Sequence, residues 1–160
     1  MERVMARNRA VRMDDELLME ALERLEECLG APLSGRTQAW AERVGWGLDE
    51  VAAGLQQHIR AAEAAAGPFA PDDLKGPMLP TADQRVHQFH EDHQNLQAET
   101  QNLRHELQAI AQPFADSPKT NDLLKFRRRV RQLVSDIQRH KENETILLLE
   151  NVNMDIGAGD

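Results

Sequence analysis

The sequence predicts an all-α fold, an up-down-up-down bundle of four helices, and three observations lead to this expectation. Tyrosine is absent and aromatic residues make up only 4% of the chain, a composition that favours helix over sheet. Apolar residues recur at alternating spacings of three and four in four stretches, as in helices with one buried face. Prolines and glycines separate these stretches. The 160 residues suffice for one core, so we expect a single domain over residues 1–160.

The first two helices are expected over residues 4–29 and 37–66, where Gly30-Ala31-Pro32 and Gly67-Pro68 end them. The stripe of the first contains Val4, Asn8, Val11, Asp15, Leu18, Leu22, Leu25 and Leu29. That of the second contains Trp40, Val44, Gly47, Val51, Leu55, His58, Ala62 and Ala65. Gly54 lies one turn before His58, where it would allow close contact between helices or leave space for a ligand. Each stripe therefore includes an ionisable side chain near its middle.

The third and fourth helices are expected over residues 82–111 and 121–150. The stripe of the third contains Val86, Phe89, His93, Leu96, Thr100, Leu103, Leu107 and Ile110. That of the fourth contains Phe126, Val130, Leu133, Ile137, His140, Glu144 and Leu147. The proline- and glycine-rich residues 67–80 predict a long irregular loop, and the tail 151–160 is expected to fray because it loses the pattern. The third stripe repeats the first and the fourth repeats the second, which indicates two similar helical hairpins.

Charge and composition exclude several classes of protein. The net charge of −8 argues against a nucleic-acid or anionic-membrane binder. No apolar run reaches the ~20 residues that cross a bilayer, and no signal-peptide pattern opens the chain. A single cysteine, Cys28, cannot form an internal disulfide. We expect a cytoplasmic protein, either a monomer or a homodimer in which a second subunit or the long loop covers part of the apolar run 146–149.

The ionisable residues in the stripes predict a metal site. His140 and Glu144 are four residues apart, so they point the same way from one helix. At about 1.5 Å per residue, His93 lies roughly 27 Å before the end of its helix and His140 about 29 Å after the start of the next, so the two are level. His58 falls close to the same level. Asp15 fits less well, and a second helix that begins near Trp40 would remove most of the difference. Buried imidazoles and carboxylates need partners, and a metal ion is the partner that this set favours, although a hydrogen-bonded pair is the alternative.

These residues carry a resemblance to the hemerythrin-like (HHE cation-binding) family over nearly the whole chain. The match consists of His58, His93 and the pair His140 and Glu144. The resemblance implies an up-down four-helix bundle with one or two non-haem irons between its helices. Zinc is the alternative metal, since histidines and a carboxylate suit it equally.

The chain departs from the family pattern at three positions. Asp15 stands where the family has a histidine, and Ala62 where a glutamate normally bridges the two irons. Phe89 stands where oxygen-carrying members have a second histidine, which argues against a simple reversible oxygen carrier. Glu63, one residue after Ala62, is expected to face solvent, and His90 is expected beside the ligands rather than among them.

The sequence thus leads to two hypotheses. The first is a non-enzymatic iron-binding domain that binds or senses O2, NO or peroxide or handles iron, with His58, His93, His140, Glu144 and Asp15 as ligands. The alternative is a metal-free four-helix bundle that acts as a protein-interaction scaffold. No catalytic residues are predicted, because no spare acid or base accompanies the ligand set.

Overall fold

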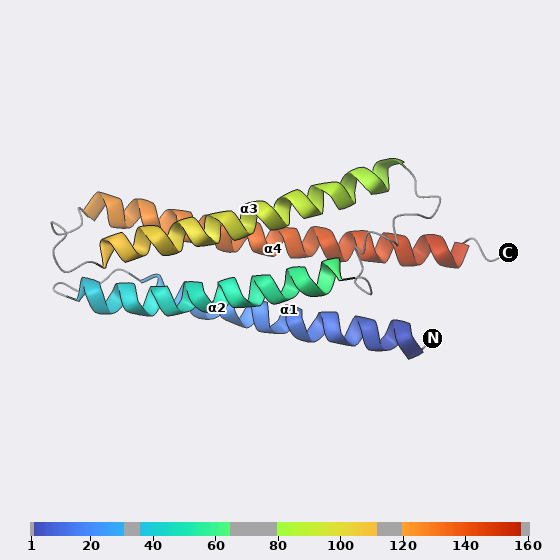
Figure 1. Cartoon of the computed structure of the whole chain (residues 1–160), viewed down its shortest axis with the longest axis horizontal. Coiled ribbons are helices and arrows are strands. Elements are labelled where there is room, and N and C mark those ends of the chain that lie inside the picture. Colours follow the sequence, from blue (N-terminus) through green and yellow to red (C-terminus); the bar gives the residue numbers. More distant parts are fainter. Residues whose placement is uncertain (1, 31–35, 65–79, 112–119, 158–160) are drawn as a thin grey trace.

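The computed structural model describes the backbone of residues 2–30, 36–64, 80–111 and 120–157, and the side chains of 15–30, 36–64, 84–111 and 121–150. The helices are α1 (Glu2–Cys28), α2 (Thr37–Glu63), α3 (Pro80–Ile110) and α4 (Thr120–Gly157). Successive helices run in opposite directions along one long axis (Figure 1). This arrangement confirms the predicted all-α four-helix bundle.

The fourth helix is longer than predicted, and most of the predicted loop 67–80 lies outside the described residues. The fourth helix was expected to stop at residue 150, but α4 continues to Gly157. Asn151 to Ile156 contain neither proline nor glycine, so losing the apolar stripe does not interrupt the backbone hydrogen bonds. Of the predicted loop 67–80, only Pro80 lies within the described residues, as the first residue of α3.

The stripes read from the sequence form the core. From Leu18 to Leu29, from Trp40 to Ala62, from Val86 to Leu107 and from Phe126 to Leu147, every stripe residue is buried. Asp15 and Ile110, at two ends of the pattern, are partly buried. Val4, Asn8, Val11 and Ala65 lie outside the described side chains. The phase of each helix was therefore predicted correctly, and it brings the polar stripe residues into the bundle interior.

Two glycines allow α1 and α2 to pack closely. A Cβ atom added at Gly54 would lie 3.3 Å from the Cα atom of Leu18, and one added at Gly47 would lie 3.3 Å from the Cα atom of Leu25. Both contacts are with backbone, which cannot move away as the end of a side chain can. Of the two roles that the sequence leaves open for Gly54, the structure supports close helix contact.

Polar contacts fasten the end of α1 to two other helices. The indole Nε1 of Trp40 donates a 2.7 Å hydrogen bond to the carbonyl of Gly30, and Nε of Arg127 donates one of 2.7 Å to the carbonyl of Leu29. These carbonyls have no partner within α1, so the side chains of α2 and α4 act as its C-terminal cap. The rings of Trp40 and Phe126 pack edge to face with centroids 6.2 Å apart.

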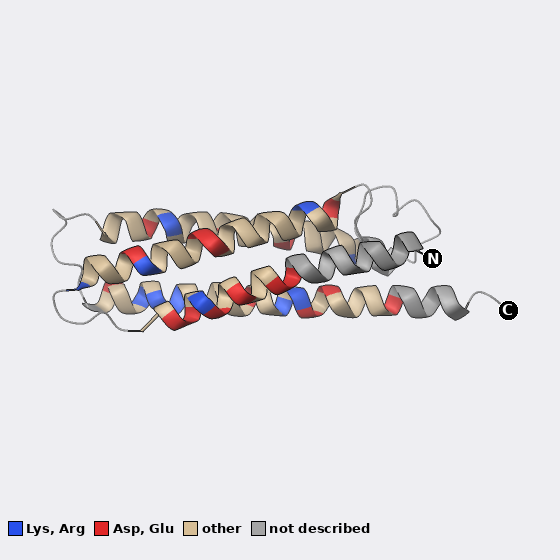
Figure 2. Ribbon diagram, turned by 90° about the horizontal axis from the view of Figure 1, so that it is seen from below, with Lys and Arg blue, Asp and Glu red and all other residues tan. Residues whose placement is uncertain are grey.

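Charged residues of both signs are interspersed along the helices (Figure 2). In the basic run of α4, Arg129 pairs with Glu99 and Glu106 of α3.

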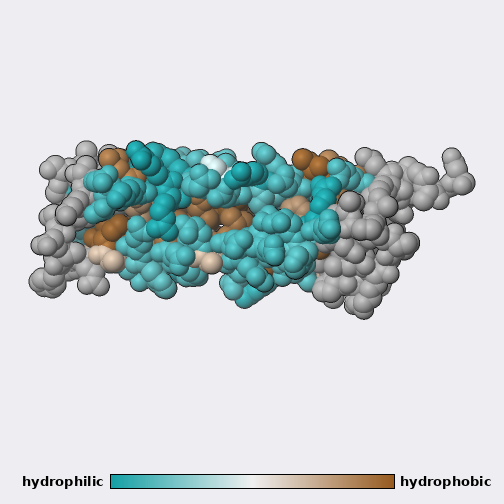
Figure 3. All heavy atoms as spheres, turned by 90° about the horizontal axis from the view of Figure 1, so that it is seen from above, coloured by the Kyte–Doolittle hydropathy of each residue, from teal (hydrophilic) through white to brown (hydrophobic). Residues whose placement is uncertain are grey.

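On the face seen in Figure 3, hydrophilic residues cover most of the described surface, and apolar ones show in the furrow between them. Near the end of α4, Leu147 is buried whereas Ile146 and Leu149 are exposed. Within the described residues, no helix combines the length and apolar character needed to cross a membrane.

Candidate metal centre

Three imidazoles from three helices meet in the interior of the bundle. His58 lies on α2, His93 on α3 and His140 on α4, and all three are at least 96% buried. Their ring centroids are 5.5 Å (His58–His93), 6.0 Å (His58–His140) and 4.7 Å (His93–His140) apart. One nitrogen of each ring can be chosen so that all three lie within 4.8 Å of one another. The structure thus brings together the three histidines that the sequence predicts.

A carboxylate on the preceding helix lies next to Nδ1 of each ring. The three pairs are His58 with Asp15 of α1 at 3.2 Å, His93 with Glu63 of α2 at 2.7 Å, and His140 with Asp92 of α3 at 3.6 Å. The first two distances are those of hydrogen bonds, and the third is too long for one. A carboxylate at Nδ1 favours the tautomer with its proton on Nδ1, so that the Nε2 lone pair becomes the free donor of the ring.

The opposite ring atoms have no such partners. Among the described residues, no hydrogen bond is made by Nε2 of His58, Nε2 of His93, either nitrogen of His140 or Oε1 of Glu144, and all five atoms are buried. Oε2 of Glu144 lies 3.4 Å from Nε2 of His58, which places the carboxylate beside the rings. Burying a polar atom without a partner costs about 1–3 kcal/mol, and here several such atoms lie together. Nitrogen and carboxylate donors in this number and arrangement could hold a transition-metal ion.

Two residues of the cluster, Asp92 and Lys141, were not predicted from the sequence, and Lys141 lies deeper in the bundle. It is buried, and its Nζ lies 2.7 Å from Oδ1 of Asp15, within ion-pair contact of Oε2 of Glu144, and 3.4 Å from Nδ1 of His58. The signal was present in the sequence, because Lys141 follows the buried Val134 by two turns and so shares its flank of the helix. An ammonium group therefore lies beside the histidine cluster, between α4 and α1.

Of the other residues considered in the sequence, Asp15 and Glu63 differ from their expected places and His90 does not. Asp15 is outside the triad of rings and contacts His58 and Lys141. Glu63, expected to face solvent, is partly buried and bonded to both His93 and His90, because α2 turns this flank toward α3. His90 lies beside the cluster, as expected. His87 and His105 are exposed.

Burial dominates the electrostatics of the cluster. Desolvation lowers the pKa of His140 to about 4, and repulsion from His93 acts in the same direction. Desolvation likewise lowers the pKa of His93, against the hydrogen bond to Glu63, which favours the charged ring. For Asp15 and Glu63, burial would raise the pKa, but the hydrogen bonds from neighbouring cationic or ring N–H groups outweigh it and lower the pKa of both. The lowered pKa values keep the rings of His93 and His140 neutral near pH 7, which is the state that binds a metal.

We expect the metal-free protein to lose stability as the pH falls from about 6.5 toward about 4. In the unfolded chain His140 has its ordinary pKa of 6.5, whereas in the folded protein burial lowers it to about 4. Between these values the unfolded state binds more protons, so acid lowers the free energy of unfolding. Urea unfolding across this range, with a chelator present, measures the slope. The variant His140→Leu is expected to have a shallower slope, and an identical slope would contradict the assigned cause.

Cavities reach the cluster from two sides. One of about 250 Å³ lies between α3 and α4 and is lined by Asp92, Asn95, Leu96, Asp136, Arg139, His140 and Asn143. A wider groove of about 790 Å³ lies between α1 and α4, with Asp15 and Lys141 in its wall. His140 belongs to the lining of the first cavity.

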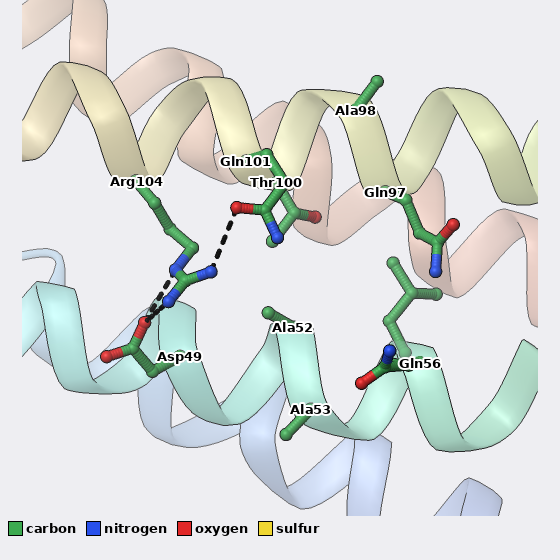
Figure 4. Close-up of a pocket in the computed structure, with 10 residues that line it drawn as sticks. Asp49, Ala52, Ala53, Gln56, Gln97, Ala98, Thr100, Gln101 and Arg104 are labelled. Atoms are coloured by element: carbon green, nitrogen blue, oxygen red, sulfur yellow. Dashed lines mark hydrogen bonds and ion pairs between the residues drawn. The ribbon is translucent and has the colours of Figure 1, made fainter.

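A third cavity, of about 490 Å³, lies between α2 and α3 away from the histidines (Figure 4). The small side chain of Ala52 points from α2 toward α3, and Nε of Arg104 donates a 2.7 Å hydrogen bond to Oδ1 of Asp49 across one end of the space. Its charged side chains are thus paired with each other, and none of its lining residues belongs to the histidine cluster.

The cluster combines three buried imidazoles and a buried carboxylate, and a cavity lies beside His140. Such a set can bind a metal ion and leave coordination positions for another ligand. No protein-family model, no curated protein and no solved structure matches this chain.

Proposed function

We propose that this chain is a metal-binding domain that holds a divalent transition-metal ion through Nε2 of His58, His93 and His140 and through Oε1 of Glu144. The observation that carries the proposal is that the two nitrogens of each ring have different surroundings. Nδ1 faces a carboxylate of the preceding helix, and Nε2 is buried and makes no hydrogen bond among the described residues, although Oε2 of Glu144 lies 3.4 Å from Nε2 of His58. Histidine ligands of metal ions are oriented in this way by an outer carboxylate.

Asp15 takes an outer role in this proposal rather than the ligand role that the sequence suggests. Its Oδ1 already contacts the ring of His58 and the ammonium of Lys141. It would therefore orient His58 and fix its tautomer. Glu63 would do the same for His93, and Asp92 for His140.

The bound metal is proposed to be iron, and zinc is the alternative. Imidazole and carboxylate ligands suit both ions. The resemblance to the hemerythrin-like family favours iron, and the positions of His58, His93 and His140 on three helices of an antiparallel bundle agree with that resemblance. The cavity between α3 and α4 supports a role in binding or sensing a small molecule such as O2, NO or peroxide.

Metal analysis tests the proposal directly. Protein purified gently from iron-supplemented cells is expected to contain close to a full equivalent of metal, and stripped protein is expected to bind Fe(II), Zn(II) or Co(II) stoichiometrically. Elemental analysis gives the content, and the Co(II) absorption spectrum reports nitrogen and oxygen ligation. Addition of NO to the Fe(II) form, followed by electron paramagnetic resonance, tests for an open position.

The scaffold hypothesis makes the opposite prediction. It is favoured by the contacts of Lys141, which neutralise Asp15 and Glu144 without a metal ion, and by the exposed Ile146 and Leu149 on α4. Only traces of metal after gentle purification, together with no binding of added ions to the stripped protein, would support the scaffold and exclude the metal domain.

A further inference from the structure

The ammonium group of Lys141 lies where a cation would be chelated. Its Nζ has Oδ1 of Asp15 at 2.7 Å, Oε2 of Glu144 in ion-pair contact and Nδ1 of His58 at 3.4 Å. Carboxylate oxygens also bind metal ions, and Asp15 and Glu144 each place one at this position. Nδ1 of His58, whose proton faces Asp15, lies beside the ammonium and is not a donor to it. The lysine side chain is buried, so this position is inside the bundle rather than on its surface.

Two side chains face this position and the histidine cluster at the same time. Glu144 has Oε2 on the ammonium, whereas its Oε1 is buried without a hydrogen-bond partner. His58 has Nδ1 toward Asp15 and Lys141, whereas its Nε2 is buried without one. The described side chains thus form two adjacent cation positions that share the carboxylate of Glu144, with the ring of His58 beside both. The ammonium group of Lys141 fills one of these two positions.

We propose that Lys141 occupies the second position of what would otherwise be a two-metal site, so that each chain binds a single metal ion. The inference rests on the proposed function, since it concerns the number of ions at the same site. Like charges a few ångströms apart inside a protein repel strongly, and Asp15 and one oxygen of Glu144 are already engaged by the ammonium. A second divalent ion would have to displace a buried, paired lysine.

A single ion changes the chemistry that the site can perform. Two ions can hold a small ligand between them and share a two-electron change, whereas one ion binds the ligand terminally. The small molecule that enters between α3 and α4 would meet one ion on the side of His140. The paired ammonium of Lys141 lies on the α1 side of the site.

The test counts ions in the full-length chain by native mass spectrometry during titration with Co(II) and, separately, with Zn(II). Four proteins are compared: wild type, Lys141→Glu, Lys141→Met and the control Lys125→Met. Lys125 is on the same helix and exposed, so its replacement removes an equal charge away from the site. Circular dichroism verifies that each variant is helical.

Wild type and Lys125→Met are expected to saturate at one ion per chain. Lys141→Glu is expected to take up two, because a third carboxylate replaces the ammonium, and Lys141→Met to take up a second ion more weakly. If Lys141→Glu does not fold, Lys141→Met decides. Two ions in wild type, or one ion in every folded Lys141 variant, would overturn the inference and leave the metal domain intact. No ion in wild type would instead overturn the proposed function.

Discussion

Replacing His140 by leucine is expected to weaken metal binding by more than about 100-fold and yet to stabilise the metal-free protein. Loss of an outer partner alone typically weakens a metal site about 10–100-fold, so loss of a ligand should exceed that range. The stabilisation follows from the burial of both ring nitrogens without hydrogen bonds. Leucine has a similar volume and no polar atoms, so we expect the free energy of unfolding to rise by about 1–3 kcal/mol.

Titration with Co(II) and urea unfolding in the presence of a chelator measure the two effects on the same variant. His87→Leu is the matched control, because that ring is exposed on α3 and lies outside the cluster. It should bind metal as wild type does. Undiminished affinity in His140→Leu would remove this ring from the ligand set. A large loss of stability in its metal-free form would mean that the ring is held by bonds that we have not assigned.

Removing the charge of Lys141 is expected to lower the free energy of unfolding of the metal-free protein by several kcal/mol. The variant Lys141→Met leaves the carboxylate of Glu144, which is 1% exposed, without its cationic partner. Breaking one side of a buried ion pair costs about 3–5 kcal/mol, because the remaining charge is desolvated without compensation. Urea unfolding near neutral pH, with a chelator present, gives the change in free energy.

The double variant Lys141→Met with Glu144→Met completes a thermodynamic cycle. Replacing both members of a buried ion pair by apolar residues of similar size is often neutral, so most of the lost stability should return. Lys125→Met, at an exposed position of α4, should change the stability by less than about 0.5 kcal/mol. If the free energy of unfolding of Lys141→Met falls by less than about 1 kcal/mol, the carboxylate of Glu144 does not depend on Lys141. That result would contradict a cation position filled by Lys141.

The spacing of the apolar residues was enough to predict the fold and the core positions of the three histidines. A helix fixes the angle between successive side chains, so one correct phase places His58, His93 and His140 in the interior. The constant rise of a helix then predicts that residues of antiparallel neighbours are level, within about a turn. These two constraints are geometric and need no knowledge of the side-chain contacts.

The partners of the rings were harder to predict because they come from the flanks of the stripes. A helix in this bundle touches two neighbours, so Glu63 on one flank of α2 meets His93 while the stripe faces the centre. Lys141 has a long flexible stem that turns its ammonium back toward Asp15 and Glu144. Periodicity assigns one direction to each helix and does not describe such oblique contacts. The extension of α4 to Gly157 was missed because a helix can outlast its apolar face.

The chain of contacts around the bundle also determines how the helices are aligned along their length. Apolar stripes repeat every three to four residues, so sliding one helix by a turn, about 5.4 Å, would bring leucines against leucines again. The carboxylate–imidazole pairs link α1 to α2, α2 to α3 and α3 to α4, and Lys141 links α4 back to α1. A one-turn slip of any single helix would separate two of these links at once. The polar cluster therefore fixes the axial register of the four helices, whether or not an ion is bound.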